Sequence, residues 1–167
     1  MPKKKNIYLS GFMASGKSTV GRMLARRLDY HYVDVDREIV AQTGMTIEKI
    51  FSRYGEAYFR HLESKLLARL ARSKKNVVSL GGGAVLAATN RQIFKSGYWI
   101  YLDVPFSVLQ RRLNNNPRGR PLARKGTDLI LDLYRRRQFL YHQAPYIIRC
   151  GTERPDFICQ RILNKIK

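Results

Sequence analysis

The stretch GFMASGKS, Gly11 to Ser18, decides the fold of this 167-residue chain. It fits the pattern G-x-x-x-x-G-K-S without a mismatch, and it lies between an apolar run at 6–10 and an amphipathic segment. Glycines at both ends let backbone N–H groups point at phosphate oxygens, and the start of a helix adds partial positive charge. We therefore predict a phosphate-binding loop that contacts a nucleotide through Ala14, Ser15, Gly16, Lys17, Ser18 and Thr19.

Side chains in and after this loop indicate phosphoryl transfer. Lys17 can reach the β- and γ-phosphates, and the Ser18 hydroxyl can bind Mg²⁺. Asp34 and Asp36 end the β-like run YVDVD at 32–36, where ligands bind in open α/β sheets. One carboxylate can hold Mg²⁺ through its waters, and the other can accept a hydrogen bond from an attacking hydroxyl. The alternative is that they only end a strand or cap a helix near Arg37.

Apolar periodicity predicts an α/β protein with a parallel sheet of about five strands and helices on both faces. We expect one domain over 1–167, without a linker or an internal repeat. The strands are expected at 6–10, 32–36, 76–83, 98–105 and 146–150, and the helices at about 16–28, 45–55, 56–73, 128–143 and 156–167, with another helix opening at Pro105. The segment 111–127 has no apolar period and is predicted to be a mobile basic loop.

The charge of the chain is unusual. Lys and Arg number 32 against 12 Asp and Glu, which gives a net charge of +20. Such an excess attracts anions of every kind, nucleic acids included, but no RNA-binding motif accompanies it. We therefore expect no dedicated nucleic-acid partner. The spacing of Cys150 and Cys159 fits neither a zinc site nor a redox pair, which indicates free thiols, and with no apolar run long enough for a membrane we expect a cytoplasmic protein.

Three arginines are candidates for binding an anionic substrate: Arg60, Arg120 and Arg137. A guanidinium group pairs with a carboxylate or a phosphate through two parallel hydrogen bonds. Glu63 lies three residues after Arg60, on the same helix face, and can orient it. Three consecutive glycines at 81–83 end a predicted strand and indicate close approach of a ligand.

Together these stretches resemble the shikimate kinase family over essentially the whole chain. The matching pieces are GFMASGKSTVG, DVD, TGMTIEKIFSRYGEAYFRHLE, SLGGGAV, GRPLA and RRQFLY. The loop is common to many NTPases, whereas the third piece, followed by the triple glycine, is far more specific. The resemblance implies a P-loop fold of nucleoside-monophosphate-kinase type with a lid at about 114–126. It implies transfer of phosphate from ATP, with Mg²⁺, to the 3-hydroxyl of shikimate on the route to chorismate and aromatic amino acids.

The resemblance also implies roles for individual residues. Asp36 would bind the shikimate hydroxyls and orient or deprotonate the attacking one, while Lys17 and Arg120 neutralise charge on the phosphoryl group. Ser18 would bind Mg²⁺ directly and Asp34 through water. The shikimate carboxylate would pair with Arg60 and Arg137, with the ring against Gly82 and Gly83. The surroundings of adenine would be Arg112, Arg154 and Pro155.

Two features depart from the family pattern: the lid is about two residues longer than in some relatives, and the turn CGTERP carries Gly151 and Glu153 where some have Asp and Asn. Other readings are another small-metabolite or nucleotide kinase, such as a gluconate kinase, and a basic nucleic-acid-binding protein that keeps a phosphate loop. We expect a monomer whose partners are shikimate and ATP.

Overall fold

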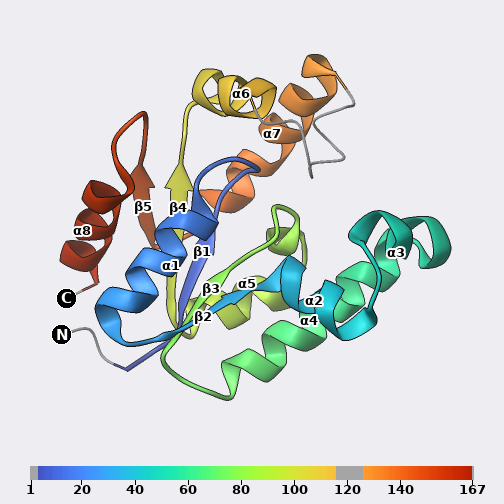
Figure 1. Cartoon of the computed structure of the whole chain (residues 1–167), viewed down its shortest axis with the longest axis horizontal. Helices are drawn as coiled ribbons and strands as arrows, with labels where there is room; N and C mark the ends of the chain where they lie inside the picture. Colours follow the sequence, from blue (N-terminus) through green and yellow to red (C-terminus); the bar gives the residue numbers. More distant parts are fainter. Residues whose placement is uncertain (1–3, 116–125, 167) are drawn as a thin grey trace.

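The computed structural model describes residues 4–115 and 126–166. Over these residues the chain forms one sheet of five parallel strands in the order β2-β3-β1-β4-β5, so the predicted parallel α/β architecture is confirmed (Figure 1). The phosphate-binding loop follows the central strand. The strands are β1 (Ile7–Ser10), β2 (His31–Asp34), β3 (Asn76–Ser79), β4 (Tyr98–Asp103) and β5 (Tyr146–Arg149).

Helices cover both faces of the sheet because side chains of a strand alternate between them. Tyr8, Trp99 and Tyr101 point to one face, where they meet aromatic rings of α5 and α7. On the other face, α1 packs beside α8 (Figure 1). The helices are α1 (Lys17–Leu28), α2 (Val35–Thr43), α3 (Ile47–Tyr54), α4 (Glu56–Ala71), α5 (Ala88–Lys95), α6 (Phe106–Asn115), α7 (Thr127–Tyr141) and α8 (Pro155–Lys165), with a 3₁₀ turn, η1 (Ala84–Leu86).

The end of β2 differs from the prediction. The strand stops at Asp34, and Asp36 lies in the first turn of α2 rather than in the strand. The physical reason is capping: the Asp34 side chain accepts a hydrogen bond from Arg37 N at 3.3 Å, which favours the start of a helix. The relative position of the Asp34 and Asp36 side chains is therefore set by the cap and first turn of α2, and not by the alternation of side chains along a strand.

The break between the helices predicted at 45–55 and 56–73 is confirmed. Thr46 caps α3 by accepting from Lys49 N at 3.2 Å, and Gly55 ends that helix while α4 begins at the next residue. This tight junction makes α3 and α4 pack against each other beside the sheet (Figure 1).

The structure corrects the extent of the basic loop and adds one helix. Helix α6 continues to Asn115, because Leu109 and Leu113 recur at helical spacing and are both buried. Residues 111–115 of the predicted loop therefore belong to this helix, and residues 116–125 of the expected lid lie outside the described part. Helix α5 stands in the stretch 84–97, to which the sequence assigned no element.

The core lies between the sheet and its helices. Its largest buried side chains include Trp99, whose indole N–H donates to Ser10 Oγ at 2.9 Å. Ser10 in turn donates to the Ile100 carbonyl at 3.2 Å, so these buried polar atoms have partners. Across residues 4–115 and 126–166, every helix is too short or too polar to cross a membrane.

Candidate active site

The loop between β1 and α1 is shaped to receive an anion. Gly16 has φ +94° and precedes α1, and Ala14 also has a positive φ, of 65°. Since Gly16 supplies no capping side chain, the first N–H groups of α1 are left to a ligand. The Lys17 ammonium donates to the Gly11 and Phe12 carbonyls at 2.8 and 2.9 Å, which holds its charge beside the loop.

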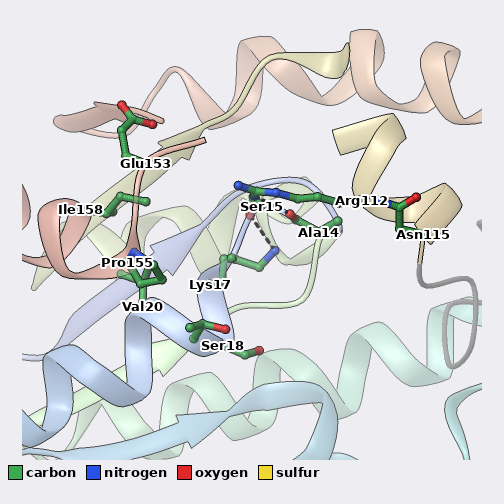
Figure 2. A pocket seen from close by; sticks show the side chains of 12 residues that line it. Ala14, Ser15, Lys17, Ser18, Val20, Arg112, Asn115, Glu153, Pro155 and Ile158 are labelled. Atoms are coloured by element: carbon green, nitrogen blue, oxygen red, sulfur yellow. Dashed lines mark hydrogen bonds between the residues drawn. The ribbon is translucent and has the colours of Figure 1, made fainter. Parts of the chain in front are cut away.

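A cavity of about 490 Å³, the P-loop cavity, opens over this loop (Figure 2). Arg112 of α6 closes one side, donating to the Ala14 carbonyl and to the Gly151 carbonyl, both at 3.0 Å. It thereby ties the loop to the turn between β5 and α8. The lining residues are Ala14, Ser15, Gly16, Lys17, Ser18, Thr19, Val20, Arg112, Asn115, Glu153, Pro155 and Ile158.

Of the residues predicted to surround adenine, two line this cavity and one does not. Arg112 and Pro155 line it, whereas Arg154 is absent from its lining and Arg120 lies outside the described residues. Asn115, Glu153 and Ile158 line it without having been predicted. Ile158 follows Pro155 by three residues, so helical spacing from the start of α8 was the signal that could have found it.

An oxygen-only pair stands at the mouth of the loop. Ser18 Oγ donates to Asp34 Oδ2 at 3.1 Å, and Tyr32 donates to the same oxygen at 3.4 Å. Mg²⁺ prefers such hard oxygen ligands and is usually bound through one or two protein groups, water and phosphates. The donor set therefore fits Mg²⁺, although the described residues contain no group of three or more His, Cys, Asp or Glu side chains that could hold a metal alone.

Beside these residues lies a second group, the acceptor cluster, at the same end of the sheet. It consists of Asp36, Arg60, Glu63, Arg137 and Tyr141, gathered around the glycines that follow β3. A side chain at Gly81 would come within 2.8 Å of both Asp36 Oδ1 and Glu63 Oε1, and one at Gly82 within 3.1 Å of Arg137 Nη1. The glycines thus admit the cluster's own side chains, whereas the sequence indicated only the approach of a ligand.

The two arginines of the cluster are held from different helices. Arg60 on α4 donates to Glu63 Oε2 at 2.9 Å and to Glu56 Oε1 at 3.0 Å, which gives it the orientation that the sequence suggested. Arg137 on α7 is 8% exposed, and its Nε has no partner among the described residues. A buried guanidinium with an unpaired donor is costly unless an anion completes it.

Tyr141 was not among the predicted site residues. It is fully buried at the end of α7, stacks on Tyr101 with ring centres 5.1 Å apart, and donates to the Gly82 carbonyl at 2.5 Å. This bond fixes the glycine turn against α7. Burial raises the pKa of Tyr141 to about 12, so the hydroxyl stays protonated and remains a donor at neutral pH. Only its place four residues after Arg137 connects it with the site in sequence.

Burial also changes the two carboxyls of the cluster. It raises the pKa of Asp36 above the ordinary 3.8, with the charge of Asp34 acting in the same direction and Lys17 and Arg60 against it. Burial likewise raises the pKa of Glu63 despite Arg60 beside it. A carboxylate with a raised pKa accepts a proton more readily, which suits Asp36 to the role of a base.

Transfer of a phosphoryl group from a nucleotide to a small anion requires a phosphate-binding loop and an acceptor site side by side. With its strand order, this arrangement makes the chain a P-loop kinase.

The comparisons give the family. A model of the shikimate kinase family matches residues 13–167, and the chain belongs to that family. It is 40% identical over 164 residues to the shikimate kinase of Persephonella marina, covering 98% of this chain and 99% of that protein. By family, the chain is an ATP-dependent kinase.

Solved structures agree. The shikimate kinase from Acinetobacter baumannii, in complex with shikimate, superposes with a TM-score of 0.90 at 36% identity, over 99% of this chain and 94% of that one. The shikimate kinase from Aquifex aeolicus gives 0.84 at 38% identity, over 95% and 94%.

Proposed function

We propose that this protein transfers the γ-phosphoryl group of Mg-ATP to the 3-hydroxyl of shikimate. The observation that carries the proposal is the acceptor cluster, because it holds a buried, incompletely paired Arg137 and a partly buried Asp36 near the phosphate loop. Arg137 favours an anionic substrate, and Asp36 favours one with a hydroxyl to activate.

On the nucleotide side, the backbone N–H groups of residues 14–19 bind the phosphates. The Lys17 ammonium group contacts the β- and γ-phosphate oxygens. Ser18 would hold Mg²⁺ directly and Asp34 through water, and the ion would supply charge neutralisation on the phosphates. Arg112 and Pro155, which line the P-loop cavity, would border the base, and the family resemblance adds Arg154.

On the acceptor side, Asp36 accepts a hydrogen bond from the attacking hydroxyl and takes its proton. Arg60 and Arg137 pair with the shikimate carboxylate, and Gly82 and Gly83, which leave room for these two side chains, approach the ring. Because the protein mainly positions groups and stabilises charge in phosphoryl transfer, the rigid supports of these residues matter as much as the residues themselves.

The remaining assignments rest on the family resemblance. Arg120 would neutralise charge on the transferring group, and the segment at about 114–126 would close over both substrates and exclude water. We also propose a single-domain, monomeric, cytoplasmic enzyme. Both halves of the site come from one chain, and the buried free thiols of Cys150 and Cys159 fit a reducing compartment.

The test is ADP release by the purified protein with Mg-ATP, with and without shikimate, at moderate salt. We expect a rate that depends strongly on shikimate, and its loss in Lys17→Met, because that substitution removes the charge that binds the phosphates. A folded protein that binds ATP but is stimulated by gluconate or a nucleoside monophosphate instead would overturn the acceptor assignment. Salt-sensitive oligonucleotide binding without kinase activity would favour the nucleic-acid alternative.

A further inference from the structure

A second pocket has no lining residue in common with the acceptor cluster, although His142 in its lining directly follows Tyr141. It measures about 350 Å³ and shares no lining residue with the P-loop cavity. It is built around β5, the last strand of the sheet order, and the end of α8. We call it the edge pocket; its lining residues are Asp103, His142, Ile147, Arg149, Arg161 and Lys165.

Positive charge dominates this pocket. Arg149, Arg161 and Lys165 line it against the single carboxylate of Asp103. Arg161 and Lys165 stand one helical turn apart on α8, where like charges repel. Three cations in one small hollow are stabilised when an anion lies between them.

The contacts of Arg161 leave its charge available for an anion. Arg161 Nη1 donates to the Arg149 carbonyl at 2.7 Å and lies 3.6 Å from Glu153 Oε1, with both side chains of that ion pair about half exposed. Such an exposed pair is weak and gives way to a stronger anion. The contact to the carbonyl fixes the guanidinium at the sheet edge without neutralising its charge.

The one acidic side chain is already engaged. Asp103 Oδ1 accepts from the Tyr101 hydroxyl at 3.1 Å, and Oδ2 lies 3.9 Å from His142 Nε2. The other His142 nitrogen, Nδ1, lies 2.8 Å from the Gln138 carbonyl. Asp103 thus lines the pocket with both carboxylate oxygens near other side chains, and its single negative charge is outnumbered by the three cations in the same lining.

We propose that the edge pocket binds the phosphate group of a small anion, at a site separate from the nucleotide. A guanidinium group matches phosphate geometry by paired hydrogen bonds, and an ammonium adds a point charge. The volume exceeds what one phosphate group fills, so an attached small organic group is accommodated.

The test is a titration of the full-length, ¹⁵N-labelled protein with inorganic phosphate at constant ionic strength. A saturating non-hydrolysable ATP analogue with Mg²⁺ occupies the phosphate loop first. We expect saturable shifts of the Arg149, Arg161 and Lys165 amide signals, with those of Gly16 and Ser18 unchanged. Absence of such shifts up to about 20 mM phosphate, above the millimolar dissociation constants of a few charge-assisted contacts, would overturn the proposal.

Two matched double variants distinguish phosphate binding at the edge pocket from general attraction by the positive charge of the protein. Arg161→Gln with Lys165→Gln removes two cations of the pocket. Lys65→Gln with Arg69→Gln removes one Lys and one Arg at the same spacing on the exposed face of α4. We expect about tenfold or more weaker phosphate binding in the first double variant and less than about twofold change in the second, because only the first loses direct contacts. Equal weakening in both would overturn the site.

The source of the phosphate group is decided by repeating the titration with glycerol 3-phosphate. Tighter binding than inorganic phosphate assigns the pocket to an organic phosphate, and equal binding assigns it to the free ion. Because neither titration involves turnover, the result is independent of the proposed kinase reaction.

Discussion

The proposed role of Asp36 is to take the proton of the attacking hydroxyl, and the burial that raises its pKa also has a cost in stability. We expect Asp36→Asn to lower kcat by about 10²–10⁴, because the amide cannot take the proton of the attacking hydroxyl. Steady-state kinetics of the purified variant measures this. A variant that keeps wild-type turnover would exclude Asp36 as the base.

The same variant carries a pH-dependent prediction for stability. The folded-state pKa of Asp36 is raised, so ionisation destabilises the folded protein; the penalty is complete above the folded-state pKa and absent below the unfolded value of 3.8. Asp36→Asn is therefore at least as stable as wild type at pH 7, and its advantage shrinks as the pH falls toward 3.8. Urea unfolding at several pH values measures the difference, and an advantage that grows on acidification would contradict the assignment.

The proposed role of Arg137 is to bind the substrate carboxylate. Arg137→Ala removes a charge-assisted pair with the shikimate carboxylate, worth roughly 1.5–3 kcal/mol, which raises the KM for shikimate about 10- to 150-fold. Its exposed neighbour Arg136, paired with Asp132 at 2.8 Å, provides the control Arg136→Ala, which should leave the KM unchanged. A normal shikimate KM in Arg137→Ala, with the melting temperature preserved, would refute the role.

At the scale of elements, two glycines that end helices allow a paired test. Gly44 after α2 has φ +66° and ψ 13°, whereas Gly55 between α3 and α4 has φ +86° and ψ 166°. A side chain at either position would meet no atom within 4 Å, so backbone preference alone decides the outcome. The region of Gly55 is essentially restricted to glycine, while that of Gly44 also accepts Asn.

We therefore expect Gly55→Asn to lower the free energy of unfolding by roughly 1–3 kcal/mol and Gly44→Asn by less than about 1 kcal/mol. Urea unfolding of both variants measures this. Since Arg60 lies in the second turn of α4, Gly55→Asn should also raise the KM for shikimate. Equal losses of stability in the two variants would mean that the junction of α3 and α4 relaxes freely.

At the scale of the whole molecule, a net charge of +20 acts on both anionic substrates. Long-range attraction raises their local concentration and is screened by salt, with a Debye length of about 10 Å at 0.1 M and about 3 Å at 1 M. We expect kcat/KM for shikimate to fall as NaCl is raised, more than kcat at saturating substrate. An uncharged solute at equal osmolarity is the control, and a salt-independent kcat/KM would show that the charge does not steer substrate.

Local signals of sequence were enough for the sheet and the loop. The pattern from Gly11 to Ser18 and the alternation of apolar strands with amphipathic helices depend on neighbours a few residues apart, which a sequence displays directly. The cap at Thr46 and the stop at Gly55 are of the same kind. The end of β2 was placed two residues too late because the capping preference of Asp34 competes with the strand pattern, and α5 was missed because eight residues give a weak helical period.

Contacts between distant segments could not be derived in that way. The sequence singled out Arg60 and Arg137, but only the packing of α4 and α7 around the turn after β3 brings them to one place. Tyr141 ties that turn to α7. Glu153 and Ile158 reach the P-loop cavity because α8 packs on α1, and the edge pocket exists because α8 ends beside β5. Bringing distant segments of the chain together costs conformational entropy, and only burial of the shared core offsets that cost. These sites therefore exist only in the folded protein.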